Sequence, residues 1–275
     1  MQATLVVVAC IALAILLTTV VIPLQKLNKA ERLIDSGEYK AAYLLLDGMD
    51  YKNSKELRES IRTLYEKELL SEAEVGSRAV FGTYEQDNDT SNGEEEIEWI
   101  VLAREGSRVL LISRYALDCR QYNVAYTWVT WETCTLREWL NGTFLNAAFS
   151  EEERAMIPSV TVSADKNPRF ITTPGNSTTD RVFLLSITEA NRYFSSDESR
   201  KCLPTPYAAA QGVWTSEWEE VDGKQACRWW WLRSPGSHSN DIAAVGSTGG
   251  INDCGIINYQ GNGAVRPALW VDLGS

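Results

Sequence analysis

Histidine is almost absent from this chain, since His238 is the only one among 275 residues. A single imidazole excludes His-rich metal sites and argues against a catalytic triad with histidine as its base. The cysteines form no Cys-x-x-Cys pair, so neither a zinc ribbon nor a thioredoxin-type motif is indicated. Runs of lysine and arginine are missing and the net charge is −11, which argues against a nucleic-acid backbone as partner. We therefore predict no metal, no cofactor and no nucleic acid.

The six cysteines leave two interpretations open. They could form one or two disulfides in an oxidising compartment, although their spacing does not give the pairing. Alternatively they are free thiols that pack as small apolar groups, which is the interpretation we adopt at this stage. One lies in an apolar N-terminal run and five follow it: Cys10, Cys119, Cys134, Cys202, Cys227 and Cys254.

The chain does have a long uncharged apolar run near its start, residues 3–24. A helix of this length crosses a hydrocarbon core of about 30 Å, so residues 1–25 are predicted to anchor the chain in membrane lipid. A cleaved signal peptide is the alternative, but its apolar region is usually shorter and follows a basic residue. The orientation is open. By the positive-inside rule, the charges of Lys26, Lys29 and Arg32 favour a cytoplasmic location for the residues that follow the apolar run. A displayed recognition domain, which we expect, must instead lie outside the cytoplasm.

Residues 26–74 have helical periodicity and are predicted to form a stalk. The first helix is expected to end at Gly37 and the second at Gly48, because glycine readily adopts the backbone that closes a helix. A capping box of Asn53 and Glu56 is expected to begin the third. The segment resembles one tetratricopeptide-type helical hairpin, too little for a solenoid.

Residues 75–275 are predicted to form an α+β head domain. Its period changes to that of strands, and residues 97–103 and 109–113 are expected to form a β-hairpin. Capping boxes predict short helices that begin after Ser150 and Ser186. The expected fold class is therefore α+β, with helices inserted among antiparallel strands.

The head domain is organised around the stretch Trp229–Trp270. Its two apolar ends, WWWL and ALWV, are predicted to be buried strands, and seven glycines divide the middle into short hairpins and turns. We predict that these hairpins present a ligand-binding surface. Its expected polar contacts are Ser237, His238, Asn240, Asp241, Thr248, Asn252, Asp253, Asn258, Tyr259 and Asn262.

Four residues of the same stretch are assigned structural roles. Arg233 and Arg266 each lie beside a proline, where a guanidinium group can bind loop carbonyls and stack on tryptophan; anion binding is the alternative. Trp230 and Trp270 belong to the expected core. Because side chains alternate along a strand, Trp230 should point away from its two Trp neighbours, so at least one of the three should face solvent or ligand.

Several blocks of the sequence resemble a bacterial domain family whose members often follow a membrane anchor and helical repeats. The blocks are FGTYEQD, NGEEEIEWIVLAREGSRVLLISRYALDC, TWVTWETCTLREWLNGTFLNAAFSEEE, RVFLLSITEANRYF, WWWLRSPG and AVRPALWV, and the resemblance extends over about residues 75–273. The family is similar to the C-type-lectin-like fold shared by formylglycine-generating enzymes and by variable proteins of diversity-generating retroelements. The resemblance implies a fold and leaves the function to be argued from a site.

The composition of residues 234–263 is compatible with such a variable protein. The segment contains no Lys, Glu, Met or Trp, which adenine-directed mutagenesis of Asn- and Ser-type codons cannot produce. The alternative, which we favour for this segment, is that exposed Gly- and Asn-rich hairpins simply avoid these residues.

Catalytic motifs are weak in this sequence. A thiol–imidazole pair could combine His238 with Cys254 or Cys227, and Asp241 with Asp253 could act as paired acids, but no local signature accompanies either. The copper-binding cysteines of formylglycine-generating enzymes have no matching motif. The calcium motif of C-type lectins has only a partial counterpart in residues 251–253. We therefore expect a membrane-anchored recognition module for a protein or glycan, and not an enzyme; an enzyme related to formylglycine-generating or hydrolytic proteins and a structural envelope protein are the alternatives.

Overall fold

The computed structural model describes residues 2–274, with side chains from Val6 onward. Met1 and Ser275, and the side chains of residues 3–5 of the predicted anchor, lie outside this part. The chain divides into two compact units, Met1–Glu72 and Ala73–Ser275. Each unit is described by itself.

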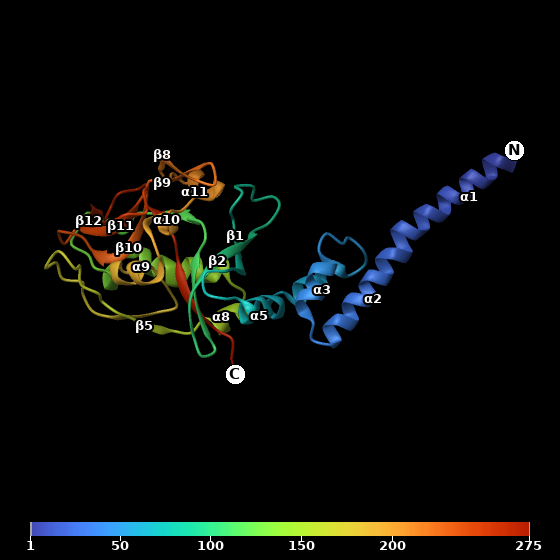
Figure 1. Cartoon of the computed structure of the whole chain (residues 1–275), viewed down its shortest axis with the longest axis horizontal. Coiled ribbons are helices and arrows are strands. Elements are labelled where there is room, and N and C mark those ends of the chain that lie inside the picture. The colour runs from blue at the N-terminus through green and yellow to red at the C-terminus, as the bar shows by residue number, and fades with distance from the viewer. Residues whose placement is uncertain (1, 275) are drawn as a thin grey trace. The chain divides into compact units, whose positions relative to one another are not determined.

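The first unit begins with one continuous helix, built from α1 (Gln2–Leu16), the π-helical turn η1 (Leu17–Val21) and α2 (Ile22–Asp35) (Figure 1). Pro23 cannot donate a backbone hydrogen bond, and the wider turn just before it absorbs the mismatch without ending the helix. From Val6 to Asp35 the helix has an apolar window of mean hydropathy 2.8 whose side chains are not buried within the described chain. It is long and apolar enough to cross a membrane.

The rest of this unit is helical, as predicted: α3 (Tyr39–Leu46), α4 (Ser54–Ser60) and α5 (Arg62–Glu72). Stacked Tyr43 and Tyr65 rings, 4.0 Å apart, join α3 to α5. The predicted capping box of Asn53 is wrong. Ser54 holds this turn instead, because its hydroxyl accepts from the Tyr51 amide and donates to a carbonyl.

The second unit is the head, which is α+β as predicted. Its first sheet has the order β1-β2-β3-β14-β7, and the predicted hairpin is confirmed as the β2–β3 pair. The last strand returns to the start of the head, since it pairs antiparallel with β3. The strands are β1 (Arg78–Tyr84), β2 (Glu95–Glu105), β3 (Arg108–Ser113), β7 (Val182–Phe183) and β14 (Ala268–Asp272).

The second sheet has the order β12-β11-β10-β13-β4. All seven residues of its middle strand are buried. The expectation that strand alternation would expose one of the three tryptophans is wrong, because both faces of this strand are covered: Trp230 packs near Phe194 and Trp231 near Tyr122. The strands are β4 (Asp118–Cys119), β10 (Trp229–Pro235), β11 (Asp241–Gly246), β12 (Ile251–Ile257) and β13 (Ala264–Val265).

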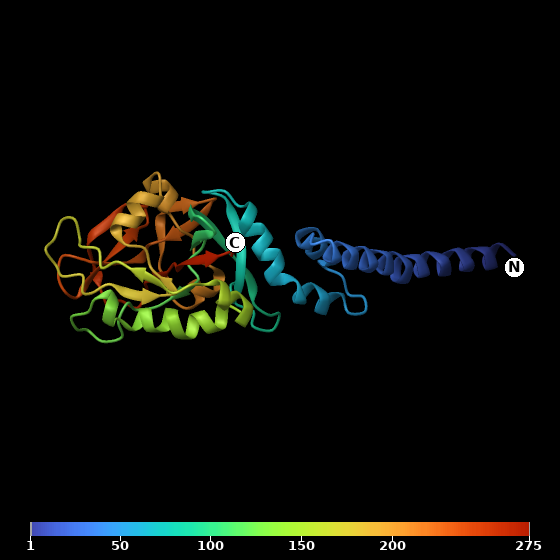
Figure 2. The same ribbon diagram turned by 90° about the horizontal axis from the view of Figure 1, so that it is seen from below.

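Helices and two small hairpins surround these sheets. A helical run from α6 through η3 to α7 lies along one side of the head (Figure 2). The capping boxes that begin at Ser150 and Ser186 are confirmed. The remaining elements are α6 (Thr135–Trp139), η3 (Leu140–Phe144), α7 (Leu145–Ala148), α8 (Glu151–Met156), α9 (Ile187–Tyr193), α10 (Asp197–Arg200), α11 (Pro206–Ala210), the 3-10 turn η2 (Trp131–Thr133), and the hairpins β5–β6 (Val160–Val162, Thr178–Asp180) and β8–β9 (Thr215–Val221, Lys224–Cys227).

Candidate functional site

Three loop segments meet at one end of the second sheet, and we call residues 121–130, 236–241 and 257–260 together the loop surface. Backbone hydrogen bonds join the three. The Asn258 amide donates to the Asn240 carbonyl at 2.9 Å, the Asn123 amide donates to the Asn258 carbonyl at 2.9 Å, and the Val129 amide donates to Ser239 at 3.2 Å. Segments more than a hundred residues apart in sequence thus form one surface.

Asn258 holds this junction from inside. Its side chain is 0 % exposed, and Nδ2 donates to the Thr127 carbonyl at 2.6 Å. A ligand cannot reach a side chain that is fully buried. Asn258 was predicted as a ligand contact, and the structure corrects this to a structural role.

Two large aromatic side chains project from the first loop. Trp128 is 83 % exposed and Tyr126 is 65 % exposed. The Tyr126 ring meets Tyr259 edge-on at 5.0 Å, and its hydroxyl accepts from Asn240 Nδ2 at 2.7 Å. A hollow of about 430 Å³ is lined by Tyr126, Thr127, Trp128 and Asn240. Exposed rings beside a hollow with amide and hydroxyl groups suit ligand contact.

Tyr126 and Trp128 are not among the contact residues that the sequence predicts. The segment YNVAYTWVTW has four aromatic residues in ten, which was a visible pattern. Its outer aromatics, Tyr122 and Trp131, are buried, whereas the inner two are exposed. Sequence spacing does not separate these two groups, because residues 122–130 belong to neither a helix nor a strand.

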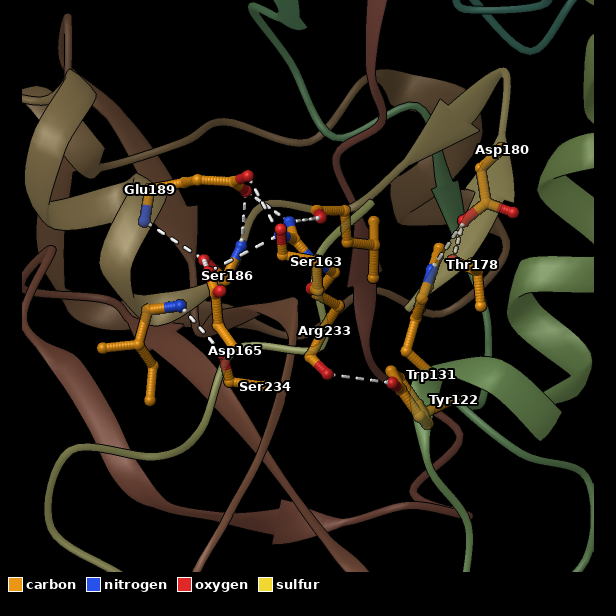
Figure 3. A network of polar contacts seen from close by, with 12 residues as sticks. Tyr122, Trp131, Ser163, Asp165, Thr178, Asp180, Ser186, Glu189, Arg233 and Ser234 are labelled. Atoms are coloured by element: carbon orange, nitrogen blue, oxygen red, sulfur yellow. Dashed lines mark hydrogen bonds and ion pairs between the residues drawn. The ribbon is translucent and has the colours of Figure 1, made fainter. Parts of the chain in front are cut away.

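The ends of this loop are anchored by buried polar contacts (Figure 3). The Tyr122 hydroxyl donates to the Arg233 carbonyl at 3.3 Å, and Trp131 Nε1 donates to Asp180 at 2.9 Å. Asp180 also binds Arg137 at 2.6 Å. Burial raises the pKa of Tyr122 well above its usual range, so the phenol stays neutral. The exposed rings are therefore presented from fixed ends.

Arg233 is the centre of the buried network behind the loop surface (Figure 3). Its guanidinium group donates to the carbonyls of Ser163 and Leu184 and to both carboxylate oxygens of Glu189. Asp165 lies 3.7 Å away. Because Glu189 also closes the capping box of α9, Arg233 ties β10 to this helix and to the 163–165 loop.

Arg266, between β13 and β14, is also a buried arginine whose guanidinium group binds backbone carbonyls. It is 1 % exposed, donates to the Ser113 and Arg200 carbonyls, and lies 5.1 Å from the Trp230 ring. Burial lowers its pKa. Trp270 is half-buried in β14.

His238 is exposed and sits between two oxygen atoms. Its Nδ1 lies 3.0 Å from Ser237 Oγ and 3.0 Å from Asp241 Oδ2. In a Ser–His–Asp triad the serine and the carboxylate bind different ring nitrogens. Here both share Nδ1, so this arrangement orients the imidazole on an exposed side chain.

Of the cysteines in the other proposed pairs, Cys254 is exposed on β12, and its carbonyl accepts from the Ser237 amide at 2.7 Å. Cys227 is buried in the core, away from solvent. Asp253 forms an ion pair with Arg169 at 2.9 Å, whereas Asp241 contacts His238. Each acid thus has its own cationic or imidazole partner.

The predicted contact residues divide into separate groups. Ser237, His238, Asn240, Asp241 and Tyr259 belong to the loop surface, as does the buried Asn258. The others lie elsewhere: Asn252 and Asp253 on β12, Asn262 hydrogen-bonded to the Gly212 carbonyl, and Thr248 in the β11–β12 turn. That turn is at the far end of its hairpin, roughly 20 Å from Asp241 at the usual rise of a strand.

Three carboxylates at the start of the head could hold a cation. Oxygen atoms of Glu85, Asp87 and Glu95 lie within 4.8 Å of one another. Each already accepts backbone amides of its own loop, for example Glu95 from Gln86 at 2.7 Å. The expectation that the protein holds no metal stays a prediction.

Comparison with known proteins gives a match to a protein family. A family model described as a domain of unknown function, DUF6273, matches residues 106–273. No curated protein and no solved structure matches the chain. The matched region begins in the β2–β3 turn and ends after β14, so it includes every segment of the loop surface.

Proposed function

The chain belongs to the DUF6273 family, a domain of unknown function, and we propose that it is a membrane-anchored recognition module whose loop surface binds a protein or glycan. The observation that carries this proposal is the exposure of Trp128 and Tyr126 on a loop with fixed ends. Large rings that are held in place lose little conformational entropy on binding. Binding would therefore retain most of the free energy gained by covering them.

The polar groups around these rings support the same function. Asn240, His238 and Tyr259 offer donors and acceptors within the surface. Tyr, Ser and Asn with a few Trp is the composition of adaptable binding surfaces such as antibody loops. We propose contact without bond cleavage, because Nδ1 of His238 is shared by Ser237 and Asp241 in a way that suits orientation.

A C-type-lectin-like fold is our proposal for the head. It is supported by the return of β14 beside β3, which brings both ends of the domain into one sheet, and by a second sheet that carries the loops. If the loops are diversified by a retroelement, exposed positions such as Asn252 and Ile257 can vary. Gly263 cannot, because a Cβ there would overlap the Trp231 indole.

We also propose that the head lies outside the cytoplasm, since a recognition module must meet its ligand. The apolar helix supports a membrane anchor. Protease added to intact cells should remove the head and leave the anchor. Protection of the head in intact cells, with digestion only after lysis, would contradict this orientation.

The binding proposal is tested by screening the full chain, in detergent or nanodiscs, on glycan and peptide arrays. Trp128→Ala should weaken binding of any hit by about 2 kcal/mol, roughly 30-fold. Trp218→Ala is the matched control, because Trp218 is 87 % exposed on the β8–β9 hairpin. Equal loss in both variants, or no loss in either, would contradict the assignment of the loop surface.

A further inference from the structure

Two buried cysteines from separate segments are in contact in the head. Cys202 follows α10 and Cys227 ends β9, and both are buried. The Cys227 amide donates to the Cys202 carbonyl at 2.7 Å, which brings the two residues together. A backbone hydrogen bond holds two α-carbons within about 6.5 Å, which is inside the range that a disulfide spans.

A buried cation, Arg266, acts on these sulfur atoms through its charge. Arg266 interacts electrostatically with both thiols, while its hydrogen bonds go to the neutral carbonyls of Ser113 and Arg200. Burial opposes ionisation of Cys202, but the hydrogen bond from Cys227 and the charge of Arg266 outweigh it and lower the pKa of Cys202. The thiolate is the form that attacks a disulfide.

We propose that Cys202 and Cys227 form a disulfide when the head folds in an oxidising compartment. The Cys202 thiolate attacks a disulfide of a thiol–disulfide oxidoreductase or of glutathione, and one thiol leaves. The Cys227 sulfur then attacks the mixed disulfide and releases the second thiol. Two protein thiols thus lose two protons and two electrons, and the exchanged disulfide becomes two thiols.

The cross-link would fasten an accessory segment to the core. It encloses α11 and the β8–β9 hairpin, which carries the exposed Trp218. The other cysteines of the head are placed differently: Cys134 Sγ contacts the Trp131 carbonyl and Cys119 Sγ the Gly261 carbonyl. Cys134 is therefore a buried control without the proposed chemistry.

The arrangement of tryptic sites makes the test direct. Cleavage after Lys201, Lys224 and Arg228 places the two cysteines in separate peptides, 202–224 and 225–228. The full chain, purified without reductant, is equilibrated with reduced and oxidised glutathione, alkylated in denaturant and digested. We expect a linked pair of peptides that separates on reduction, with Cys134 alkylated. Two unlinked peptides, each with its cysteine alkylated, would overturn the proposal.

Thermal unfolding provides a second measurement. The proposed disulfide would close the loop between Cys202 and Cys227. Reduction should therefore lower the unfolding midpoint of the wild type and of Cys134→Ser by about 6–12 °C. Reductant should leave Cys202→Ser/Cys227→Ser unchanged, and an equal shift in that variant would contradict the proposal.

The disulfide proposal depends on the proposed function in one respect, which is that an extracytoplasmic head lies in an oxidising compartment. If glutathione links the pair in the purified protein but the thiols are free in cells, the proposed orientation fails and the chemistry of the pair stands. The loop surface is not involved in this test.

Discussion

The strand β10 and the loop that follows it are adjacent in sequence but opposite in character. Every residue of Trp229–Pro235 is buried, and the charge of Arg233 is matched by carboxylates and carbonyls within the head. From Gly236 onward the chain turns outward and His238 is exposed. The buried strand sets where the loop begins, and the loop is then free to present side chains. Substitutions should therefore affect stability in the first region and binding in the second.

Arg233→Met has the largest expected effect on stability, because it changes the buried strand. Removing the cation leaves the buried side of Glu189 and two carbonyls without their donor, which should cost about 3–5 kcal/mol in the free energy of unfolding. Urea unfolding of the full chain can be followed by fluorescence, because all ten tryptophans lie in the head.

Arg169→Met is the matched control for Arg233→Met. Arg169 is an exposed residue whose ion pair with Asp253 should contribute about 0–1 kcal/mol. Comparable destabilisation by both variants would show that the Arg233 network does not hold the buried strand.

The sequence predicted the local features of this architecture and failed where distant segments meet. The capping boxes at Ser150 and Ser186 and the β2–β3 hairpin depend on residues a few positions apart. The burial of Asn258 depends on Thr127, 131 residues away. No periodicity encodes such a contact.

The tryptophans give the same lesson. Alternation along β10 was a sound guide to side-chain direction, but it cannot reveal that both faces of this strand are covered. Likewise the pattern of aromatics in residues 122–131 does not tell the buried ends from the exposed middle. Exposure follows from what the rest of the fold places against each side chain.

Gly263→Ala tests whether the buried strand β10 limits the residues that the neighbouring loop can carry. A Cβ at this position would overlap the Trp231 indole, so the loop or the ring must move, at about 1–3 kcal/mol. Gly261→Ala is the control two residues earlier, where a Cβ would meet open space and the change should stay within about 0.5 kcal/mol. Equal losses of unfolding free energy in Gly263→Ala and Gly261→Ala would show that the Trp231 indole does not restrict which residue can occupy position 263.

Asn258→Ala and Asn252→Ala test two residues that the sequence treated alike. Losing Asn258 leaves the Thr127 carbonyl without its donor inside the junction, which should cost about 1–3 kcal/mol. Asn252 is exposed on β12 and its side chain exchanges hydrogen bonds with the Gly255 backbone at 3.2 and 3.4 Å, so its replacement should cost less, about 0.5–1 kcal/mol. If Asn252→Ala is the more damaging, the division into buried frame and free surface is wrong.

The smallest effect concerns alkaline pH. Burial raises the pKa of Tyr122 well above 10 and that of Cys134 to about 12. In the unfolded chain both groups release their protons at lower pH, so the unfolded state binds fewer protons above pH 10 and stability falls as pH rises. Tyr122→Phe removes one such group and should reduce the slope of unfolding free energy between about pH 10 and 11 by up to about 1.4 kcal/mol per pH unit. The pH slope of Cys134→Ser, measured in parallel, separates the contribution of the thiol from that of the phenol. An unchanged slope in Tyr122→Phe would mean that the Tyr122 ring is solvated. Residues 121–130 would then lack one of their two fixed ends.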